Sequence, residues 1–164
     1  MGNSSNSDHD YYGEWKDGKC KCEGGEKKVY NNSKVLTLYY ETTHLTNMHA
    51  EIWSDFGRRL TLGITEFWFK WQPLVHGYVL AEIKCSNCKE NKYVTFEYGN
   101  YGKRWRIGNY NKVYRTYNHY KPSNMNIKYI LDKFDKMEGF NSEDYNFRNN
   151  NCQHFAKELY KKIT

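Results

Sequence analysis

The sequence alternates short apolar runs with turn residues and then changes to two stretches with helical spacing. Six runs rich in β-branched and aromatic residues lie at 34–40, 49–53, 58–69, 77–85, 92–99 and 103–108. Turn signals such as SDFG, CSNCKEN and GNYG separate them, which predicts an antiparallel β-meander of about five or six strands. Because the helical stretches come after the strands, we expect an α+β fold with the helices packed on one face of the sheet.

The first helical stretch spans 124–138, and its apolar residues recur at the spacing of one helix face (Ile127, Ile130, Leu131 and Phe134). Ser123 is the residue we expect to cap its start, because a serine oxygen can accept from the first free N–H groups. Gly139 is expected to stop the helix, since glycine tolerates the left-handed backbone that ends many helices.

The first 28 residues are polar and rich in Gly, Ser, Asn and Lys, which predicts a flexible tail before a single domain at 29–164. Aromatic residues make up 18% of the chain, so a disordered chain is excluded and an aromatic core is expected. No apolar run reaches the length of a membrane span and no secretory signal is present, which predicts a cytoplasmic protein. The start MGNSSN approaches an N-myristoylation signal, but Asn6 stands where Ser or Thr is usual.

The net charge of +6 is spread along the chain, and many basic residues have an acidic neighbour. Such a distribution favours an ordinary solvated surface over a clustered anion-binding patch. The sequence contains no zinc-finger spacing with paired histidines and no aromatic strand of the RNA-recognition type. We therefore expect no nucleic-acid partner, while peripheral contact with a phospholipid surface stays open.

The segment NNNCQHFAKELYKKI (149–163) predicts an amphipathic helix that opens on a cysteine. Asn150 or Asn151 is a suitable cap, and Phe155 begins the apolar stripe three residues after Cys152. A thiol in the first turn feels the positive end of the helix dipole, which favours the reactive thiolate. The alternative is a structural cysteine buried in the core, since cysteine is among the most buried residue types.

A cysteine nucleophile needs a base within hydrogen-bond reach. Three of the six histidines are poor candidates on sequence grounds: His9 in the tail, His119 in a polar loop, and His154, which is two residues from Cys152 on the same helix and points away from it. His49, His44 and His76 remain. His49 begins the expected strand HAEIW and is the base that we favour, while His44 and His76 stay open as replacements for it.

The helix motif NNNCQHFAKEL resembles the nucleophile helix of the permuted papain-like thiol enzymes, which include the lecithin:retinol acyltransferase-like, PPPDE and NlpC/P60 branches. HAEIW, a turn and RRLTLGI resemble the histidine-bearing hairpin of these proteins. In this family a strand histidine comes first and the helix cysteine last, and the resemblance covers roughly 34–163. It implies that Cys152 is the nucleophile and His49 the general base.

The resemblance also implies a third residue on the strand after the base, commonly His, Asn or an acid. The matching register falls at Thr61, which can accept a hydrogen bond from an imidazole but carries no charge. Glu66, further along the same strand, is an alternative. The implied chemistry is acyl transfer through a thioester, on lipid esters or on peptide and isopeptide bonds. The alternative is an inactive binding module that keeps the fold.

The remaining cysteines form two close pairs, Cys20 with Cys22 and Cys85 with Cys88. Four thiolates in two pairs suit a tetrahedral structural zinc site. Such a site would fasten the N-terminal segment to the sheet and would leave no position open for substrate. Thiols in a reducing compartment, or disulfides in an exported protein, are the alternatives. No cofactor is expected for catalysis.

Overall fold

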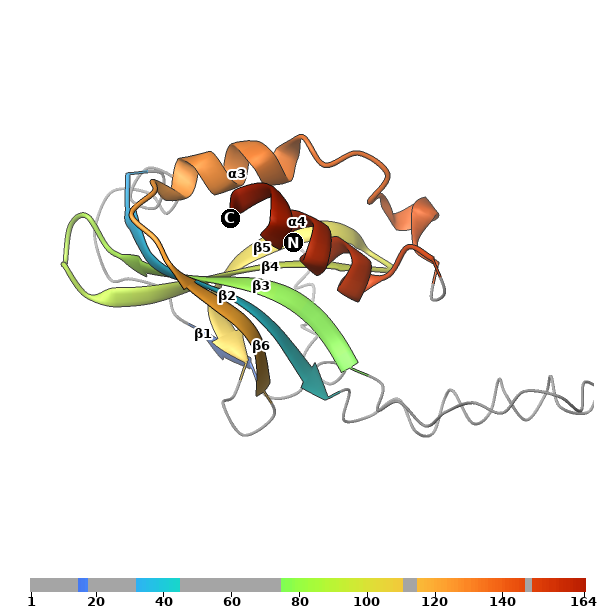
Figure 1. Ribbon diagram of the computed structural model, residues 1–164, viewed down its shortest axis with the longest axis horizontal. Helices are drawn as coiled ribbons and strands as arrows, with labels where there is room; N and C mark the ends of the chain where they lie inside the picture. The colour runs from blue at the N-terminus through green and yellow to red at the C-terminus, as the bar shows by residue number, and fades with distance from the viewer. Residues whose placement is uncertain (1–14, 18–31, 45–74, 111–114, 147–148) are drawn as a thin grey trace, which may run out of the picture.

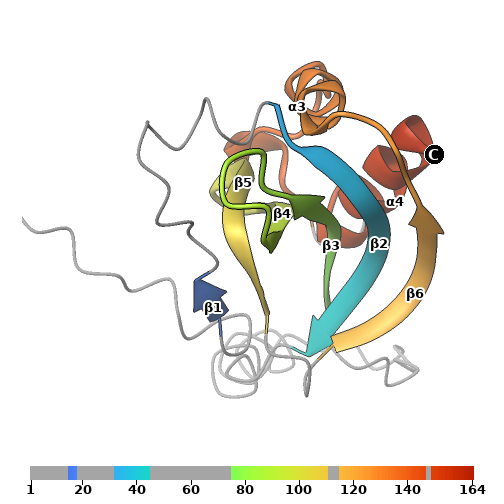
Figure 2. The ribbon, with the colours of Figure 1, turned by 90° about the vertical axis from the view of Figure 1, so that its left-hand side faces the viewer.

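The computed structural model describes residues 15–17, 32–44, 75–110, 115–146 and 149–164. Within these ranges six strands are present: β1 (Trp15–Asp17), β2 (Lys34–His44), β3 (Val75–Lys84), β4 (Asn91–Gly99), β5 (Gly102–Tyr110) and β6 (Arg115–Pro122). They form an antiparallel sheet in the order β1-β5-β4-β3-β2-β6. The chain therefore runs as a meander from β2 to β5, and β6 then returns to pair with β2 at the other edge (Figure 2).

Two strands lie where the sequence did not predict them. β1 falls inside the expected tail and pairs with the end of β5. β6 has the sequence RTYNHYKP, whose charged and polar residues hide its strand character, and it is held by pairing with β2. The predicted strands at 49–53 and 58–69 lie outside the described residues.

The two α-helices within the described ranges lie on the same side of the sheet (Figure 1), as the α+β prediction requires. Helix α3 (Ile127–Asp135) is shorter than predicted, and its cap is Asn126, not Ser123. The reason is that Ile127 N–H donates to Ser33 O while Asn126 bridges to Lys34, so the chain before Ile127 is held extended against β2. A short 3₁₀ helix, η2 (Ser142–Asp144), follows. Helix α4 (Cys152–Ile163) begins at the expected cysteine, and Asn151 caps it.

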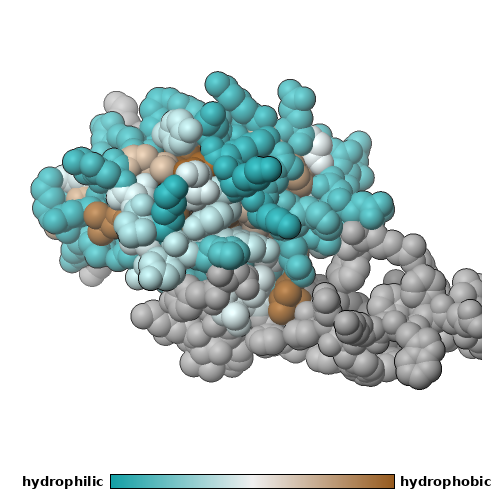
Figure 3. Space-filling view, in the orientation of Figure 1, coloured by the Kyte–Doolittle hydropathy of each residue, from teal (hydrophilic) through white to brown (hydrophobic). Residues whose placement is uncertain are grey.

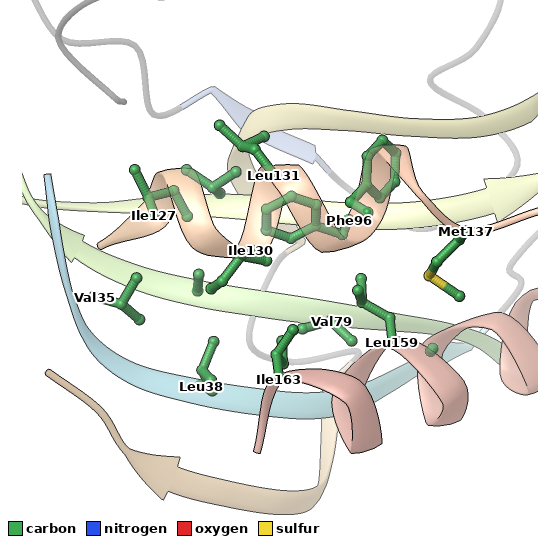
Figure 4. Close-up of a cluster of buried hydrophobic side chains, with 14 of the residues drawn as sticks. Val35, Leu38, Val79, Phe96, Ile127, Ile130, Leu131, Met137, Leu159 and Ile163 are labelled. Atoms are coloured by element: carbon green, nitrogen blue, oxygen red, sulfur yellow. The ribbon is translucent and has the colours of Figure 1, made fainter. Parts of the chain in front are cut away.

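The core lies between the two helices and one face of the sheet (Figure 4). Aliphatic side chains from β2, β3 and both helices meet there. The aromatic rings of Phe96, Tyr98, Phe134, Phe140 and Phe155 pack among them, with three ring pairs edge to face and two tilted. A smaller cluster of Tyr78, Leu80 and Tyr110 lies on the opposite face of the sheet. None of the described helices has both the length and the apolar character to cross a membrane.

Lys103 of β5 ties the sheet to the end of α3. Its ammonium group donates to the carbonyl oxygens of Phe134, Asp135 and Met137, at 2.9, 2.8 and 2.8 Å. The last carbonyl groups of a helix have no partner within the helix, and a cation there also opposes the negative end of the helix dipole. The contact therefore fixes α3 over the core.

We predict that Lys103→Met lowers the free energy of unfolding by about 1–3 kcal/mol, because it removes charge-assisted hydrogen bonds from three carbonyl groups. Urea unfolding followed by circular dichroism measures the change. Lys157→Met is the matched control, since Lys157 is exposed on α4. Equal stability of the two variants would contradict this account of α3.

Candidate functional site

The site forms where the first turn of α4 meets the backbone of β3. The Gly77 N–H donates to the Cys152 sulfur at 3.4 Å, and the Cys152 thiol faces the Val75 carbonyl oxygen at 3.9 Å. Gly77 lies one residue beyond Tyr78↔Glu97, the pair at which the β3–β4 register ends. The Cys152 sulfur at the start of α4 therefore contacts β3 at the point where the pairing of β3 with β4 ends.

Glycine at position 77 is required by this close approach. A Cβ atom there would lie 2.9 Å from the Gln153 Cα and 3.3 Å from the Cys152 carbonyl oxygen. Both contacts are with backbone, which cannot turn aside as a flexible side chain could. Asn151 Oδ1 accepts from the N–H groups of Gln153 and His154, so the helix start is fixed from its other side as well.

His76 of β3 is the histidine beside this sulfur. Its side chain is 1% exposed, and its Nε2 lies 2.9 Å from Glu97 Oε2. The Cys152 thiol lies within interaction range of this imidazole, because each group shifts the pKa of the other. Since Nε2 faces the carboxylate, Nδ1 is the nitrogen left for the sulfur. The order thiol, imidazole, carboxylate is the arrangement in which a base is oriented by a third group.

Glu97 of β4 is completely buried and is surrounded by donors. Arg104 Nε and Arg106 Nε lie 2.9 and 2.8 Å from its Oε1, and Tyr110 donates its hydroxyl to Oε2 at 2.5 Å. Arg104 stands directly opposite Glu97 in the β4–β5 register, which explains how the ion pair forms from regular strands. Burying a carboxylate is costly unless it is paired and hydrogen-bonded, and here it is both.

The charges of the site support one another. Burial alone would raise the pKa of Glu97, but the hydrogen bond and charge of His76, with the charges of Arg106 and Arg104, hold it at about 2. Burial alone would lower the pKa of His76, but hydrogen bonds and negative charge from Cys152 and Glu97 raise it to about 9. At neutral pH these shifts favour the ionised carboxylate and the protonated imidazole.

The thiol responds to the same partners. Burial would raise the pKa of Cys152, yet the hydrogen bond and charge of His76 lower it below its ordinary value. The backbone N–H groups of Gly77 and Gln153 act in the same direction. These groups favour the thiolate, which is the nucleophilic form of cysteine. The geometry therefore supports an imidazolium–thiolate ion pair.

Two tyrosine rings enclose His76 on the sheet face opposite the helices. The Tyr78 ring stacks on the imidazole with centroids 6.1 Å apart, and the Tyr110 ring meets it edgewise at 6.0 Å. Tyr78 donates its hydroxyl to Glu41 Oε2 at 2.8 Å, so each ring is anchored by a buried carboxylate. Aromatic faces attract cations, and this packing fixes the ring while stabilising its charged form.

Some of the site residues predicted from the sequence lie at this site, and others lie outside the described residues. Cys152 is buried in the first turn of α4, while His154 is exposed with its Nδ1 on Asn151 Oδ1. His49, Thr61 and Glu66 lie outside the described residues. Among the described residues it is His76, one of the open alternatives, that meets the thiol. His44 pairs with Val75 through its backbone at the end of β2.

Sequence reasoning did not single out Glu97 or its arginines. The available signal was a charged residue inside an otherwise apolar strand, since VTFEYG places Glu97 among buried neighbours. A buried carboxylate requires a partner, and His76 in VHGYVL and the arginines in KRWRIG are the nearest strand residues that could supply one.

The proposed zinc ligands are only half described. Cys85 is buried at the end of β3, Cys88 is exposed in the following turn, and Cys20 and Cys22 lie outside the described residues. Within the part of the chain that is described, no cluster of three metal-ligating side chains occurs. The zinc site therefore stays a prediction.

Comparisons with protein-family models, with curated proteins and with solved structures give no match for this chain.

We predict that Gly77→Ala slows alkylation of Cys152 by iodoacetamide and lowers stability by about 1–3 kcal/mol, because the new methyl group forces the helix start off β3. Gly139→Ala is the control: its φ of 77° makes it strained, but its Cβ would meet nothing within 4 Å. Gly139→Ala should lower the free energy of unfolding but leave the alkylation rate of Cys152 unchanged. A Gly77→Ala protein with an unchanged rate would contradict the proposed role of the contact.

We predict that Glu97→Gln moves the pH midpoint of Cys152 alkylation upward. A neutral amide stabilises the imidazolium less, so the pKa of His76 falls and the thiolate loses its cationic partner. Alkylation at pH 7 should slow by about tenfold. Glu82→Gln, a change further along the same sheet face, should leave the profile in place. Equal profiles for Glu97→Gln and wild type would show that Glu97 does not act on the thiol.

Proposed function

We propose that this protein is a thiol hydrolase or acyltransferase in which Cys152 is the nucleophile, His76 the acid and base, and Glu97 the residue that orients His76. The observation that carries the proposal is the buried His76 imidazole, whose Nε2 lies 2.9 Å from Glu97 Oε2, next to the Gly77 N–H that donates to the Cys152 sulfur. Buried charges of this kind are costly to a fold and are commonly found where chemistry requires them.

The reaction proceeds in two steps. The Cys152 thiolate attacks the carbonyl carbon of an ester, amide or thioester, and the negative charge moves to the carbonyl oxygen. The intermediate collapses, the His76 imidazolium gives its proton to the departing alcohol, amine or thiol, and a thioester on Cys152 remains. His76, now neutral, takes a proton from water or another acceptor. That acceptor attacks the thioester and the thiolate returns.

We assign the oxyanion to the backbone N–H of Cys152. Asn151 Oδ1 already accepts from the next two amide groups, and the first amide of a helix has no partner within the helix. The dipole of α4 adds positive potential at the same place.

The order of the residues supports assignment to the permuted papain-like enzymes. His76 stands on β3, Glu97 on the next strand and Cys152 on the last helix, in the chain order implied by the sequence resemblance. Glu97 is an acid in the position where the family commonly has a polar third residue. In this proposal His76 has the role of general base that the resemblance implied for His49. The scissile bond is a lipid ester or a peptide or isopeptide bond.

The same proposal places the enzyme in the cytoplasm, with peripheral membrane contact through N-myristoylation of MGNSSN. These residues lie outside the described part of the chain. A single acyl chain binds a membrane weakly and reversibly, so a second contact would be needed for stable attachment.

The test is formation of an acyl-enzyme with p-nitrophenyl acetate. We expect a burst of p-nitrophenol and one acetyl group on Cys152 in the peptide map. His76→Ala should reduce the burst rate by at least about 100-fold, as expected for loss of a general base, and His49→Ala should retain it. If His49→Ala abolishes the burst and His76→Ala does not, the base is assigned wrongly. If wild type shows no acetylation of Cys152, the protein is a binding module with this fold.

A further inference from the structure

The face of β2 and β6 beside α4 continues the site toward solvent. Gly77, whose missing Cβ faces Gln153, pairs with Thr42 of β2, and Thr42 pairs in turn with Thr116 of β6. Residues directly opposite one another in an antiparallel sheet point to the same face. Gly77, half-buried Thr42 and exposed Thr116 therefore form a row across this face of the sheet, which begins beside the Cys152 sulfur.

A second row lies two residues further along the strands. Val79 in the core pairs with half-buried Tyr40, and Tyr40 pairs with exposed His119. Tyr160 of α4 packs against both Tyr40 and His119. The three rings pack together, with Tyr40 and His119 6.2 Å apart, His119 and Tyr160 6.3 Å apart, and Tyr40 and Tyr160 6.2 Å apart.

These rings lie close to the nucleophile. Tyr40 is one strand across and two residues along from Gly77, steps of about 5 and 7 Å. Burial raises the pKa of Tyr40, and the negative charge of Cys152 raises it further, so the phenol lies within electrostatic reach of the sulfur. Tyr160 lies eight residues after Cys152 on α4, which places it about 12 Å further along the helix axis and about 80° around it.

The outer part of this surface is exposed, and exposed lysines such as Lys121 border it. Helix α4 packs mainly on β3 and β4, so the outer part of the face, on β6, remains exposed at Thr116 and His119. On this side of the molecule, pale, near-neutral residues lie over the middle, with hydrophilic residues around and among them (Figure 3). We call Thr42, Thr116, Tyr40, His119 and Tyr160 the aromatic shelf; none of the five carries a carboxylate, ammonium or guanidinium group.

We propose that the aromatic shelf binds an uncharged, ring-bearing group of the acyl donor and so determines which substrates reach Cys152. This inference rests on the proposed thiol chemistry and adds a substrate class to it. Stacking on Tyr and His rings favours flat apolar groups. With no ionic partner among the five side chains, a charged group would lose hydration without compensation.

The test compares three alkylating reagents on Cys152 of the full chain: iodoacetamide, N-benzyl iodoacetamide and N-(2-carboxyethyl) iodoacetamide. Each forms one S–C bond and releases iodide, so the reagents differ only in the attached group. Glutathione gives their intrinsic reactivity. We expect the ratio of the benzyl rate to the iodoacetamide rate to be about tenfold higher for Cys152 than for glutathione, and the carboxyethyl ratio to be no higher.

Tyr160→Ala and His119→Ala should return the benzyl ratio toward that of glutathione while the iodoacetamide rate stays within about twofold of wild type. Tyr120→Ala is the matched control: Tyr120 is 70% exposed and pairs with Tyr39, so it lies on the other face of β6. A benzyl ratio equal to that of glutathione, an unchanged ratio in the two shelf variants, or a preference for the carboxyethyl reagent overturns the shelf alone. A Cys152 that iodoacetamide does not alkylate in the folded protein overturns the proposed function, and the shelf with it.

Discussion

The contact between the first turn of α4 and the backbone of β3 is the constraint on which the site depends. Because Gly77 has no side chain, the helix start approaches the strand closely enough for the Gly77 N–H to reach the Cys152 sulfur. His76 precedes Gly77 on the strand, and at this end of β3 its imidazole lies within interaction range of the thiol. The core beneath α3 and α4 holds the helix in this place, and Asn151 fixes its first turn.

The second requirement is that a buried histidine stays charged. Desolvation opposes the imidazolium, and Glu97 offsets that cost only because Arg104, Arg106 and Tyr110 keep the carboxylate ionised. Replacing such a network with apolar residues would often stabilise a fold. Its presence beside a first-turn cysteine is one of the observations that support the proposed thiol chemistry. The Tyr78 ring stacks on the imidazole and the Tyr110 ring meets it edgewise, so the two rings hold the imidazole in place.

The sequence predicted those parts of the fold that depend on local pattern. The alternating runs revealed β2 to β5, and the helical period together with an asparagine cap located Cys152 at the start of α4. The sequence did not predict the elements that depend on tertiary contacts. Asn126 caps α3 because pairing with β2 holds the preceding chain extended, and β6 is a strand because it pairs with β2 despite its polar residues. His76 could not be ranked above His49, because only the folded chain shows which strand the helix start touches.

The measurement that tests this account most directly is an NMR titration of the His76 imidazole nitrogens, in wild type and in Cys152→Ser. The account predicts a protonated ring at pH 7 with a midpoint near 9 in wild type. It also predicts a lower midpoint in Cys152→Ser, where a neutral hydroxyl replaces the thiolate. A His76 that is neutral at pH 7 in wild type, or that titrates identically in both proteins, would contradict the imidazolium–thiolate pair.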